Sequence, residues 1–249
     1  MQKKSKFVLA AIILLSVFLI VYIGYSVFMP PVGVKDQPIN QSREILATVD
    51  LPQVEIASNM SVDQAIQNRR SVRRFSATPL SLKDVSQLLW AAQGITDFER
   101  NFRTTPSAGG VFPMEIYLVV GNNGVQELEA GIYHYNPFNH TLEMIVRGDM
   151  RYNLSQAAHK QKWVNDAPIN LIITGNYLKM QNKYSDKNLC TRFVDMEAGH
   201  IGQNIYLEAA SRGLVTVAIG SFYDDQMISL FKLPANETPL YIYPVGYRG

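Results

Sequence analysis

Hydrophobic residues are most concentrated near the start of the chain, where the segment from Phe7 to Met29 contains no charged residue. At about 1.5 Å per residue, a helix of this length crosses a hydrocarbon layer of about 30 Å. Three lysines precede the segment, so the positive-inside rule predicts a cytoplasmic N-terminus and an extracytoplasmic position for the remaining chain. A cleaved signal peptide is the alternative, but no small-x-small cleavage pattern follows the segment. We therefore expect residues 1–29 to form a cytoplasmic tip and one retained transmembrane helix, as in a single-pass membrane protein.

Between residues 30 and 58 the hydrophobic pattern loses any regular period. Four prolines and one glycine interrupt it: Pro30, Pro31, Gly33, Pro38 and Pro52. These residues favour turns and irregular backbone, so we expect a linker without regular elements over 30–58. From residue 59 to residue 249 the pattern becomes that of one folded domain in which helical and strand periods are mixed.

Two capping boxes open the first helices of this domain. Ser61 with Gln64 begins a short helix, and Ser81 with Asp84 begins a second helix that ends at Gly94. Further periodic segments predict helices at 150–160, 191–212 and 224–231 and strands at 115–121, 132–135, 141–146, 169–174, 215–219 and 240–245. In the longest helix the predicted inward-facing residues are Ile201, Ile205, Leu207 and Ala209.

The composition excludes several classes of protein. The formal net charge is only +2, and the basic residues are too evenly spread for a nucleic-acid surface. The single cysteine, Cys190, rules out an intramolecular disulfide and a cysteine-based metal cage. We expect its side chain to be buried as a small hydrophobic group. No histidine or carboxylate spacing predicts a metal site, so the domain must be held together by its apolar core.

Candidate chemistry begins with the segment Arg69-Arg70-Ser71-Val72-Arg73-Arg74. Four guanidinium groups so close together repel one another unless an anion lies among them, and arginine suits bidentate contacts to phosphate. The serine adds a hydroxyl donor. The alternative is a solvated basic edge, or basic residues lying against lipid headgroups beside the anchor.

Two further segments contain residues suited to a binding site. In 103–110, small residues and two glycines permit a close backbone approach to a flat or charged ligand, although such a loop is more often only a turn. The second segment is Glu197-Ala198-Gly199-His200 in the longest predicted helix. Gly199 indicates a close helix–helix contact, because glycine costs about 1 kcal/mol inside a helix. His200 is expected to be a buried, hydrogen-bonded histidine rather than a proton donor.

Together, and in this order, these segments resemble the nitroreductase family of flavoproteins. The resemblance covers about residue 60 to the C-terminus. It implies an α+β, nitroreductase-like fold with a central, mostly antiparallel sheet flanked by helices, which follows the predicted transmembrane helix. The domain at 59–249 would then be the FMN-binding part of the chain.

The resemblance also implies which residues bind the cofactor. In the family the arginine motif grips the phosphate and ribityl chain of FMN, and its counterparts here are Arg69, Arg70, Ser71 and Arg73. The loop that reaches the flavin from the opposite subunit of a dimer matches Pro106, Ser107, Ala108 and Gly109. The segment that passes the flavin ring matches Ile219 and Gly220, and the basic residue near the end of the chain that helps hold the phosphate matches Arg248.

Within this family the sequence is most similar to the SagB-type branch, whose members are azoline dehydrogenases. The similarity lies in the Pro-Ser-Ala-Gly loop, in 131–135 and in Glu197-Ala198-Gly199-His200. That branch carries a Lys-Tyr pair implicated in removing the proton as an azoline is oxidised, and Lys183-Tyr184 stands at about the corresponding place. This chain departs from the pattern because Ser185 replaces the usual glycine and the spacing to Arg192 is longer. A catalytic role for the pair therefore stays one alternative, and a dipeptide present by chance is the other.

The function implied is that of an FMN-dependent oxidoreductase, in which bound flavin passes two electrons to a small acceptor and NAD(P)H is a candidate co-substrate. A dehydrogenase of a peptide azoline or similar ring is the second hypothesis. The third, from a different class, is a membrane-tethered flavin-binding protein without catalysis. We further expect a homodimer with FMN at the subunit interface, a small-molecule substrate and no nucleic-acid partner.

Overall fold

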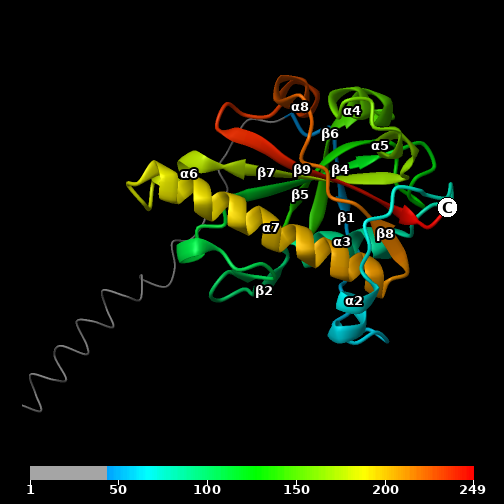
Figure 1. Ribbon diagram of the computed structural model, residues 1–249, viewed down its shortest axis with the longest axis horizontal. Coiled ribbons are helices and arrows are strands. Elements are labelled where there is room, and N and C mark those ends of the chain that lie inside the picture. The colour runs from blue at the N-terminus through cyan, green and yellow to red at the C-terminus, as the bar shows by residue number, and fades with distance from the viewer. Residues whose placement is uncertain (1–43) are drawn as a thin grey trace, which may run out of the picture. The chain divides into compact units, whose positions relative to one another are not determined.

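The computed structural model describes residues 44–249, of which 44–98 and 102–249 belong to one folded unit. Its centre is a seven-stranded antiparallel sheet with the strand order β1-β6-β5-β4-β7-β9-β8 (Figure 1). The strands are β1 (Ala47–Asp50), β4 (Met114–Val120), β5 (Gly131–Asn136), β6 (Thr141–Arg147), β7 (Ile169–Asn176), β8 (Leu214–Thr216) and β9 (Glu237–Tyr247). A separate pair is formed by β2 (Ile95–Asp97) and β3 (Phe102–Arg103). The helices are α2 (Val62–Asn68), α3 (Leu82–Gln93), α4 (Arg151–Ala157), α5 (Lys162–Asp166), α6 (Tyr177–Gln181), α7 (Lys187–Ser211) and α8 (Asp224–Phe231).

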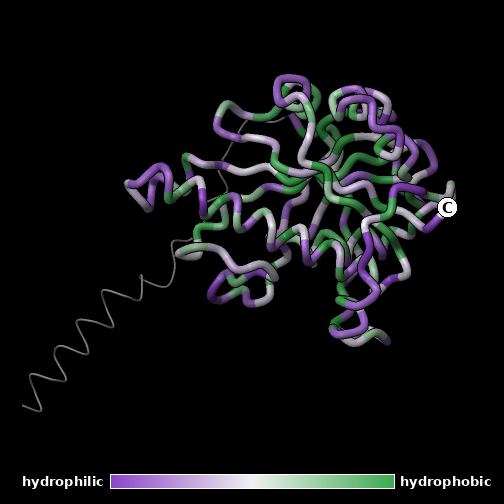
Figure 2. The backbone as a smooth tube through the Cα atoms, viewed as in Figure 1, coloured by the Kyte–Doolittle hydropathy of each residue, from purple (hydrophilic) through white to green (hydrophobic). Residues whose placement is uncertain are grey.

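Helices cover both faces of the sheet, as the α+β prediction required. Successive side chains of a strand point to opposite faces, so β4 contributes to two separate cores. Ile116 and Leu118 belong to the core shared with α3 and α7, whereas Tyr117 and Val119 belong to the core shared with α4, α5 and α8. Figure 2 shows hydrophobic residues gathered along the central strands. Because helices enclose the sheet on both faces, β7 is buried at every residue, including the polar residues Asn170, Thr174 and Asn176.

The longest helix, α7, lies across one face of the sheet (Figure 1). Its first turn is capped by Asp186, whose carboxylate accepts hydrogen bonds from the backbone N–H groups of residues 188 and 189. The helix therefore begins four residues earlier than the predicted range of 191–212. Ile201, Ile205 and Ala209 are buried as expected, whereas Leu207 is only half-buried.

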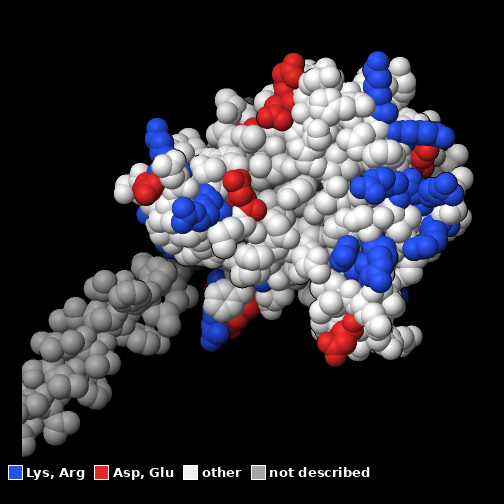
Figure 3. Space-filling model, viewed as in Figure 1, with Lys and Arg blue, Asp and Glu red and all other residues white. Residues whose placement is uncertain are grey.

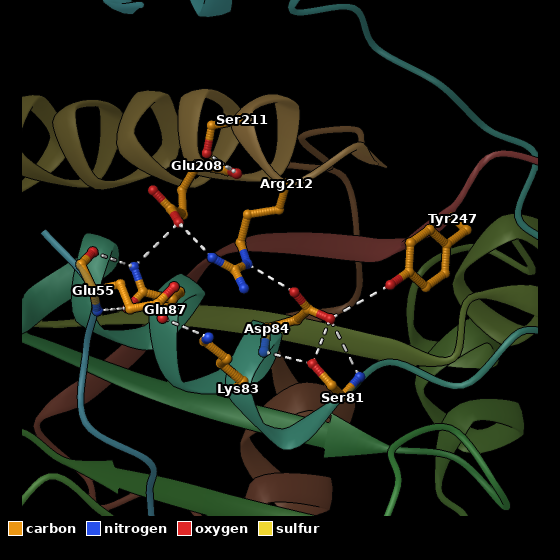
Figure 4. Close-up of polar contacts among 9 residues, drawn as sticks. All are labelled: Glu55, Ser81, Lys83, Asp84, Gln87, Glu208, Ser211, Arg212 and Tyr247. Atoms are coloured by element: carbon orange, nitrogen blue, oxygen red, sulfur yellow. Dashed lines mark hydrogen bonds and ion pairs between the residues drawn. The ribbon is translucent and has the colours of Figure 1, made fainter. Parts of the chain in front are cut away.

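A polar network fixes the C-terminal end of α7 against α3 (Figure 4). Arg212 Nε donates to Asp84 Oδ1 at 2.7 Å, and its Nη1 lies 3.7 Å from Glu208 Oε1. Tyr247, at the end of β9, donates to Asp84 Oδ2 at 3.4 Å. Burial alone would raise the pKa of Asp84, but the hydrogen bonds from Ser81 and Arg212 and the charge of Arg212 outweigh it and lower that pKa. The network thus holds the end of the last strand beside the end of the longest helix.

Both predicted capping boxes are present, and the predicted helix 224–231 matches α8 residue for residue. The predicted strands at 132–135 and 141–146 are confirmed as the paired strands β5 and β6. The helix predicted at 150–160 is shorter, because α4 ends at Ala157. The short elements α5, α6, β2 and β3 were not predicted, since segments of two to five residues are too brief to show a period.

The prediction of an irregular linker is wrong at residues 47–50. This stretch forms β1, which pairs with β6 from Ala47 opposite Met144 to Asp50 opposite Thr141. The segment after β1 is also held in place, because Ser86 of α3 donates to the carbonyl of Pro52 at 2.6 Å. No proline occurs between residues 39 and 51, so the chain can join the sheet there as an edge strand.

The predicted cytoplasmic tip and transmembrane anchor at 1–29 lie outside the described residues, as does the linker up to residue 43. Over residues 44–249, no helix has both the length and the apolar character that crossing a bilayer requires. The anchor therefore stays a prediction from sequence.

Gly202 of α7 allows the ring of Tyr243 in β9 to approach the helix closely. A Cβ added at Gly202 would collide with the buried Tyr243 hydroxyl and lie 2.8 Å from Cζ. Gly202→Ala is therefore expected to lower the free energy of unfolding by about 1–3 kcal/mol, although alanine is the better helix former. Urea unfolding measures this cost. In a Tyr243→Phe background, which lacks the hydroxyl nearest the added methyl, the cost should be smaller; equal costs in both backgrounds would contradict the proposed collision.

Candidate active site

The arginine segment lies in extended conformation against the end of the sheet. The Val72 N–H donates to the Thr216 carbonyl of β8, and the Ser76 N–H donates to the Tyr247 carbonyl of β9, both at 2.9 Å. Phe75 forms an antiparallel bridge with Arg248. These backbone pairings explain how the arginine motif and the basic residue near the end of the chain, far apart in sequence, come together in space.

Arg69, Arg70 and Arg248 line one cleft with a volume of about 160 Å³. The Arg69 guanidinium lies 5.0 Å from the centre of the Tyr206 ring, and Arg70 donates to the carbonyls of Gln67 and Arg69 at the end of α2. Figure 3 shows basic side chains gathered over the side that carries β8 and the C-terminus. Guanidinium groups concentrated around a cleft favour an anionic ligand there.

Tyr206 of α7 connects the arginine segment to the segment that follows β8. Its hydroxyl is hydrogen-bonded to Ser71 Oγ and accepts from the Ala218 N–H, both at 2.8 Å. Ile219 and Gly220 follow directly; the isoleucine is buried in a bridge with Ile242, whereas the glycine is exposed. Sequence reasoning missed Tyr206, because nothing local distinguishes it from other half-buried helix residues.

Arg73 does not line this cleft. Its guanidinium lies 5.6 Å from the centre of the Trp163 ring of α5. The predicted arginine set is therefore divided, with Arg69, Arg70 and Arg248 around one cleft and Arg73 stacked on an aromatic ring beside it.

The Pro-Ser-Ala-Gly loop forms a second group of candidate residues, together with the Lys-Tyr pair. Gly109 has a φ of 62°, and a Cβ added there would collide with the Tyr184 hydroxyl and lie 2.9 Å from Lys183 Cε. Lys183 Nζ donates to the Gly109 carbonyl. Tyr184 also packs edge-on against Phe193, with ring centres 5.3 Å apart, and its carbonyl accepts from Cys190 Sγ at 3.2 Å. The structure thus brings Lys183 and Tyr184 to the predicted loop, and it confirms the expected burial of Cys190.

The two groups lie on opposite faces of α7. Asn204 Nδ2 donates to the Thr104 carbonyl at 3.3 Å and to Thr105 Oγ1 at 3.1 Å, which fixes the start of the loop. Tyr206, which contacts the arginine segment, is two residues further along, and two helical residues differ by about 200° around the axis. The Lys-Tyr pair also precedes the first turn of α7, whereas the arginine cleft is lined by residues of its last turns. Within one copy of the chain, the predicted site residues therefore form two half-sites.

Glu197 of α7 lies beside the loop. Gln93 Nε2 donates to Glu197 Oε1 at 3.3 Å, while the buried Oε2 accepts no hydrogen bond from any residue in the described part of the chain. Burial raises the pKa of Glu197 to about 7, and the nearby Ser107 hydroxyl and Gln93 amide offset this only in part. The sequence marked this residue as part of a motif, but it did not show that the carboxyl is buried.

Two predictions for the neighbouring helix residues are wrong. His200 is exposed rather than buried, and a Cβ added at Gly199 would meet nothing within 4 Å. Gly199 therefore serves no close contact among the residues that the structure describes. Both residues lie on the outward face of α7, together with Met196, which is 54 % exposed.

The Tyr206 hydroxyl provides a test of the arginine half-site. Tyr206→Phe removes both hydrogen bonds and leaves the Ala218 N–H without its acceptor, so the free energy of unfolding should fall by about 1–3 kcal/mol. Tyr152→Phe, which alters an exposed tyrosine of α4, is the matched control and should change stability by less than about 0.5 kcal/mol. Urea unfolding compares the two; similar effects would show that the Tyr206 hydroxyl does not fasten this half-site.

Comparison with known proteins identifies the relatives of this chain. MJ1384 of Methanocaldococcus jannaschii, which is named as a nitroreductase, is 41% identical over 200 residues, which are 80% of this chain and 96% of that protein. The trifolitoxin operon protein TfxC of Rhizobium leguminosarum bv. trifolii is 24% identical over 78% of this chain, which spans 57% of that protein. These relatives agree with the resemblance to the nitroreductase family and to its SagB-type branch.

Solved structures show the same fold. A nitroreductase-type protein from Ralstonia eutropha has a TM-score of 0.71 and 29% identity, over 84% of this chain and 92% of that one. A chain of the E. coli microcin synthetase McbBCD complex, solved with truncated pro-MccB17 bound, has a TM-score of 0.63 and 21% identity, over 89% of this chain and 84% of that one. The nitroreductase family model matches residues 66–247, and the chain belongs to that family.

Proposed function

We propose that this chain is an FMN-dependent oxidoreductase that works as a homodimer and transfers two electrons to a small acceptor. The observation that carries the proposal is the cleft that gathers Arg69, Arg70 and Arg248. Membership of a family of oxidoreductases supports the reaction class. The choice of FMN rests on the fit of the residues.

The donor set of the arginine half-site fits a phosphate-bearing flavin. Arginine contributes charge-assisted, bidentate hydrogen bonds to phosphate, and Ser71 adds a neutral donor where Tyr206 holds it. Gly220 follows the buried Ile219 and is exposed, so no side chain blocks an approach to its backbone. Bound flavin would supply two-electron chemistry. The contribution of the chain would be to hold the phosphate, position the ring and place positive charge near it.

A second copy of the chain would complete the site. The loop at Pro106–Gly109 and the arginine cleft lie on opposite faces of α7, so neither reaches the other within one copy. The outward face of α7 offers exposed Met196, together with Gly199, where a Cβ would have open space. Such a face permits another helix to approach closely. In the proposed dimer, each site would take arginines from one copy and the loop from the other.

One observation favours the alternative activity, dehydrogenation of a peptide azoline. Lys183 and Tyr184 lie against Gly109, next to the loop assigned to the flavin. Lys183 Nζ donates a hydrogen bond to the Gly109 carbonyl, so Tyr184, acting as a phenolate, is the better placed of the two to accept a proton from the substrate. The likeness to a microcin synthetase chain concerns the fold alone, and it is compatible with this alternative.

The predicted anchor would place the enzyme at a membrane, with the domain outside the cytoplasm by the positive-inside rule. NAD(P)H is scarce there, so the proposed donor in that setting is a reductant of the membrane, such as a quinol. Protease treatment of intact cells tests on which side of the membrane the domain lies. Digestion of the domain only after the cells are opened would overturn this orientation.

The flavin assignment predicts that the purified full-length protein is yellow, or becomes yellow with added FMN, and bleaches on reduction. Arg248→Ala should weaken FMN binding roughly tenfold to a hundredfold, because a hydrogen bond to a charged group contributes about 1.5–3 kcal/mol. Arg147→Ala, which removes an exposed arginine paired with Glu129, is the control and should bind FMN normally. A colourless protein that binds no added FMN would exclude both enzyme hypotheses. The chain would then be a scaffold protein without catalysis.

The two enzyme hypotheses predict different effects when the Lys-Tyr pair is changed. Tyr184→Phe should slow azoline oxidation by roughly a hundredfold or more, the usual contribution of a proton-transfer group. Turnover of a quinone or nitroaromatic with NADH should be nearly unchanged, since no proton acceptor of that kind is needed. Lys187→Ala, an exposed neighbour, is the control. Equal losses in both assays would argue against a specific role for Tyr184 in azoline chemistry.

A further inference from the structure

Glu197 is a carboxyl group enclosed at the point where α7 meets the loop. It is 2 % exposed, and its neighbour Gln93 is 1 % exposed. Ser107 Oγ accepts from the Phe112 N–H at 2.8 Å, so the hydroxyl proton of Ser107 stays available for the nearby carboxyl. A buried carboxyl oxygen that accepts no hydrogen bond costs much more free energy when the group is ionised than when it is neutral.

Two cations face Glu197 from other elements, and both also hold the surroundings of the loop. Arg103 Nη1 donates to Gln93 Oε1 at 3.1 Å, and its guanidinium lies 4.8 Å from the centre of the Phe112 ring. Lys179 Nζ, from α6, donates to the Phe112 carbonyl at 2.9 Å. The positive charges of both residues act on Glu197. An ionised carboxylate would attract these cations more strongly than a neutral acid does, in competition with the bonds that they now make. It would also compete with Glu115 of β4, a carboxylate hydrogen-bonded to His134, on which both positive charges act as well.

We propose that Glu197 is a positioning residue for the loop at 103–112. As a neutral acid it accepts a hydrogen bond from the Gln93 amide, keeps its second oxygen beside the Ser107 hydroxyl, and leaves Arg103 and Lys179 to fasten the loop. Ionisation draws these cations towards Glu197 and loosens the loop. The link from loop position to turnover rests on the proposed function, whereas the positioning itself does not. Through its effect on the loop, the protonation state of Glu197 would determine how rigidly Ser107 and Gly109 are held beside the flavin bound to the other copy.

The sign of the pH effect follows from burial. The pKa of Glu197 is raised from 4.5 to about 7 in the folded chain, so the folded chain keeps a proton that the unfolded chain loses between these values. The stabilisation by the neutral acid is full below pH 4.5, declines as pH rises, and is lost above about pH 7. The loop should therefore be tightly held at pH 6 and looser at pH 8.5.

Hydrogen exchange of the full-length protein tests this without any activity measurement. After correction for the intrinsic pH dependence, exchange in the 104–112 segment should rise roughly tenfold between pH 6 and pH 8.5, as a group with this pKa ionises. Glu197→Gln keeps the size and the hydrogen bonding of the neutral acid but cannot ionise. In that variant the same segment should stay protected at both pH values, with less than about a twofold change.

Glu208→Gln is the matched control, because Glu208 is also on α7 and also accepts from an α3 glutamine, Gln87, but it belongs to the network at the other end of the helix (Figure 4). It should leave the pH dependence of the loop as in the wild type. The proposal is overturned if wild-type loop exchange follows that of the buried strand β4, or if Glu197→Gln keeps the wild-type pH dependence. Should Glu197→Gln fail to fold, the wild-type comparison of loop and strand decides alone. A protein that binds no FMN would refute the proposed function and leave this test valid.

Discussion

The burial of α7 against the sheet is the constraint on which the rest of the structure depends. The helix has 25 residues and is about 37 Å long, so it spans most of a small domain. Asp186 fixes its first turn, and the ion pair between Arg212 and Asp84 fixes its end. Its side chains at 197, 204 and 206 contact the residues of both half-sites. A shift of this one helix would therefore move both at once.

Sequence predicted those features that local rules determine. The capping boxes at Ser61 and Ser81 were found because each is complete within four residues. The hairpin of β5 and β6 was found because two short apolar runs flank a turn. The arginine motif and the Pro-Ser-Ala-Gly loop were named from a family resemblance, and the structure placed Arg69, Arg70 and Arg248 together around one cleft.

What sequence missed depends on contacts between distant residues. The strand β1 forms because it can pair with the edge of β6. Its four residues of alternating burial are too few for a strand to be recognised from sequence. Tyr206 and Glu197 matter because of partners more than 90 residues away in the chain, at Ser71 and Gln93. His200 was wrongly expected to be buried, since helical period gives relative orientation but not which face meets the sheet.

Because the two half-sites lie on opposite faces of α7, the proposed activity would depend on the concentration of the protein. A solitary copy would hold one half of each of two sites, so dilution would remove cofactor and turnover together, by mass action. The predicted anchor counters this effect. Copies confined to a bilayer meet at a far higher effective concentration than copies in solution, so attachment to the membrane would itself help to assemble the site.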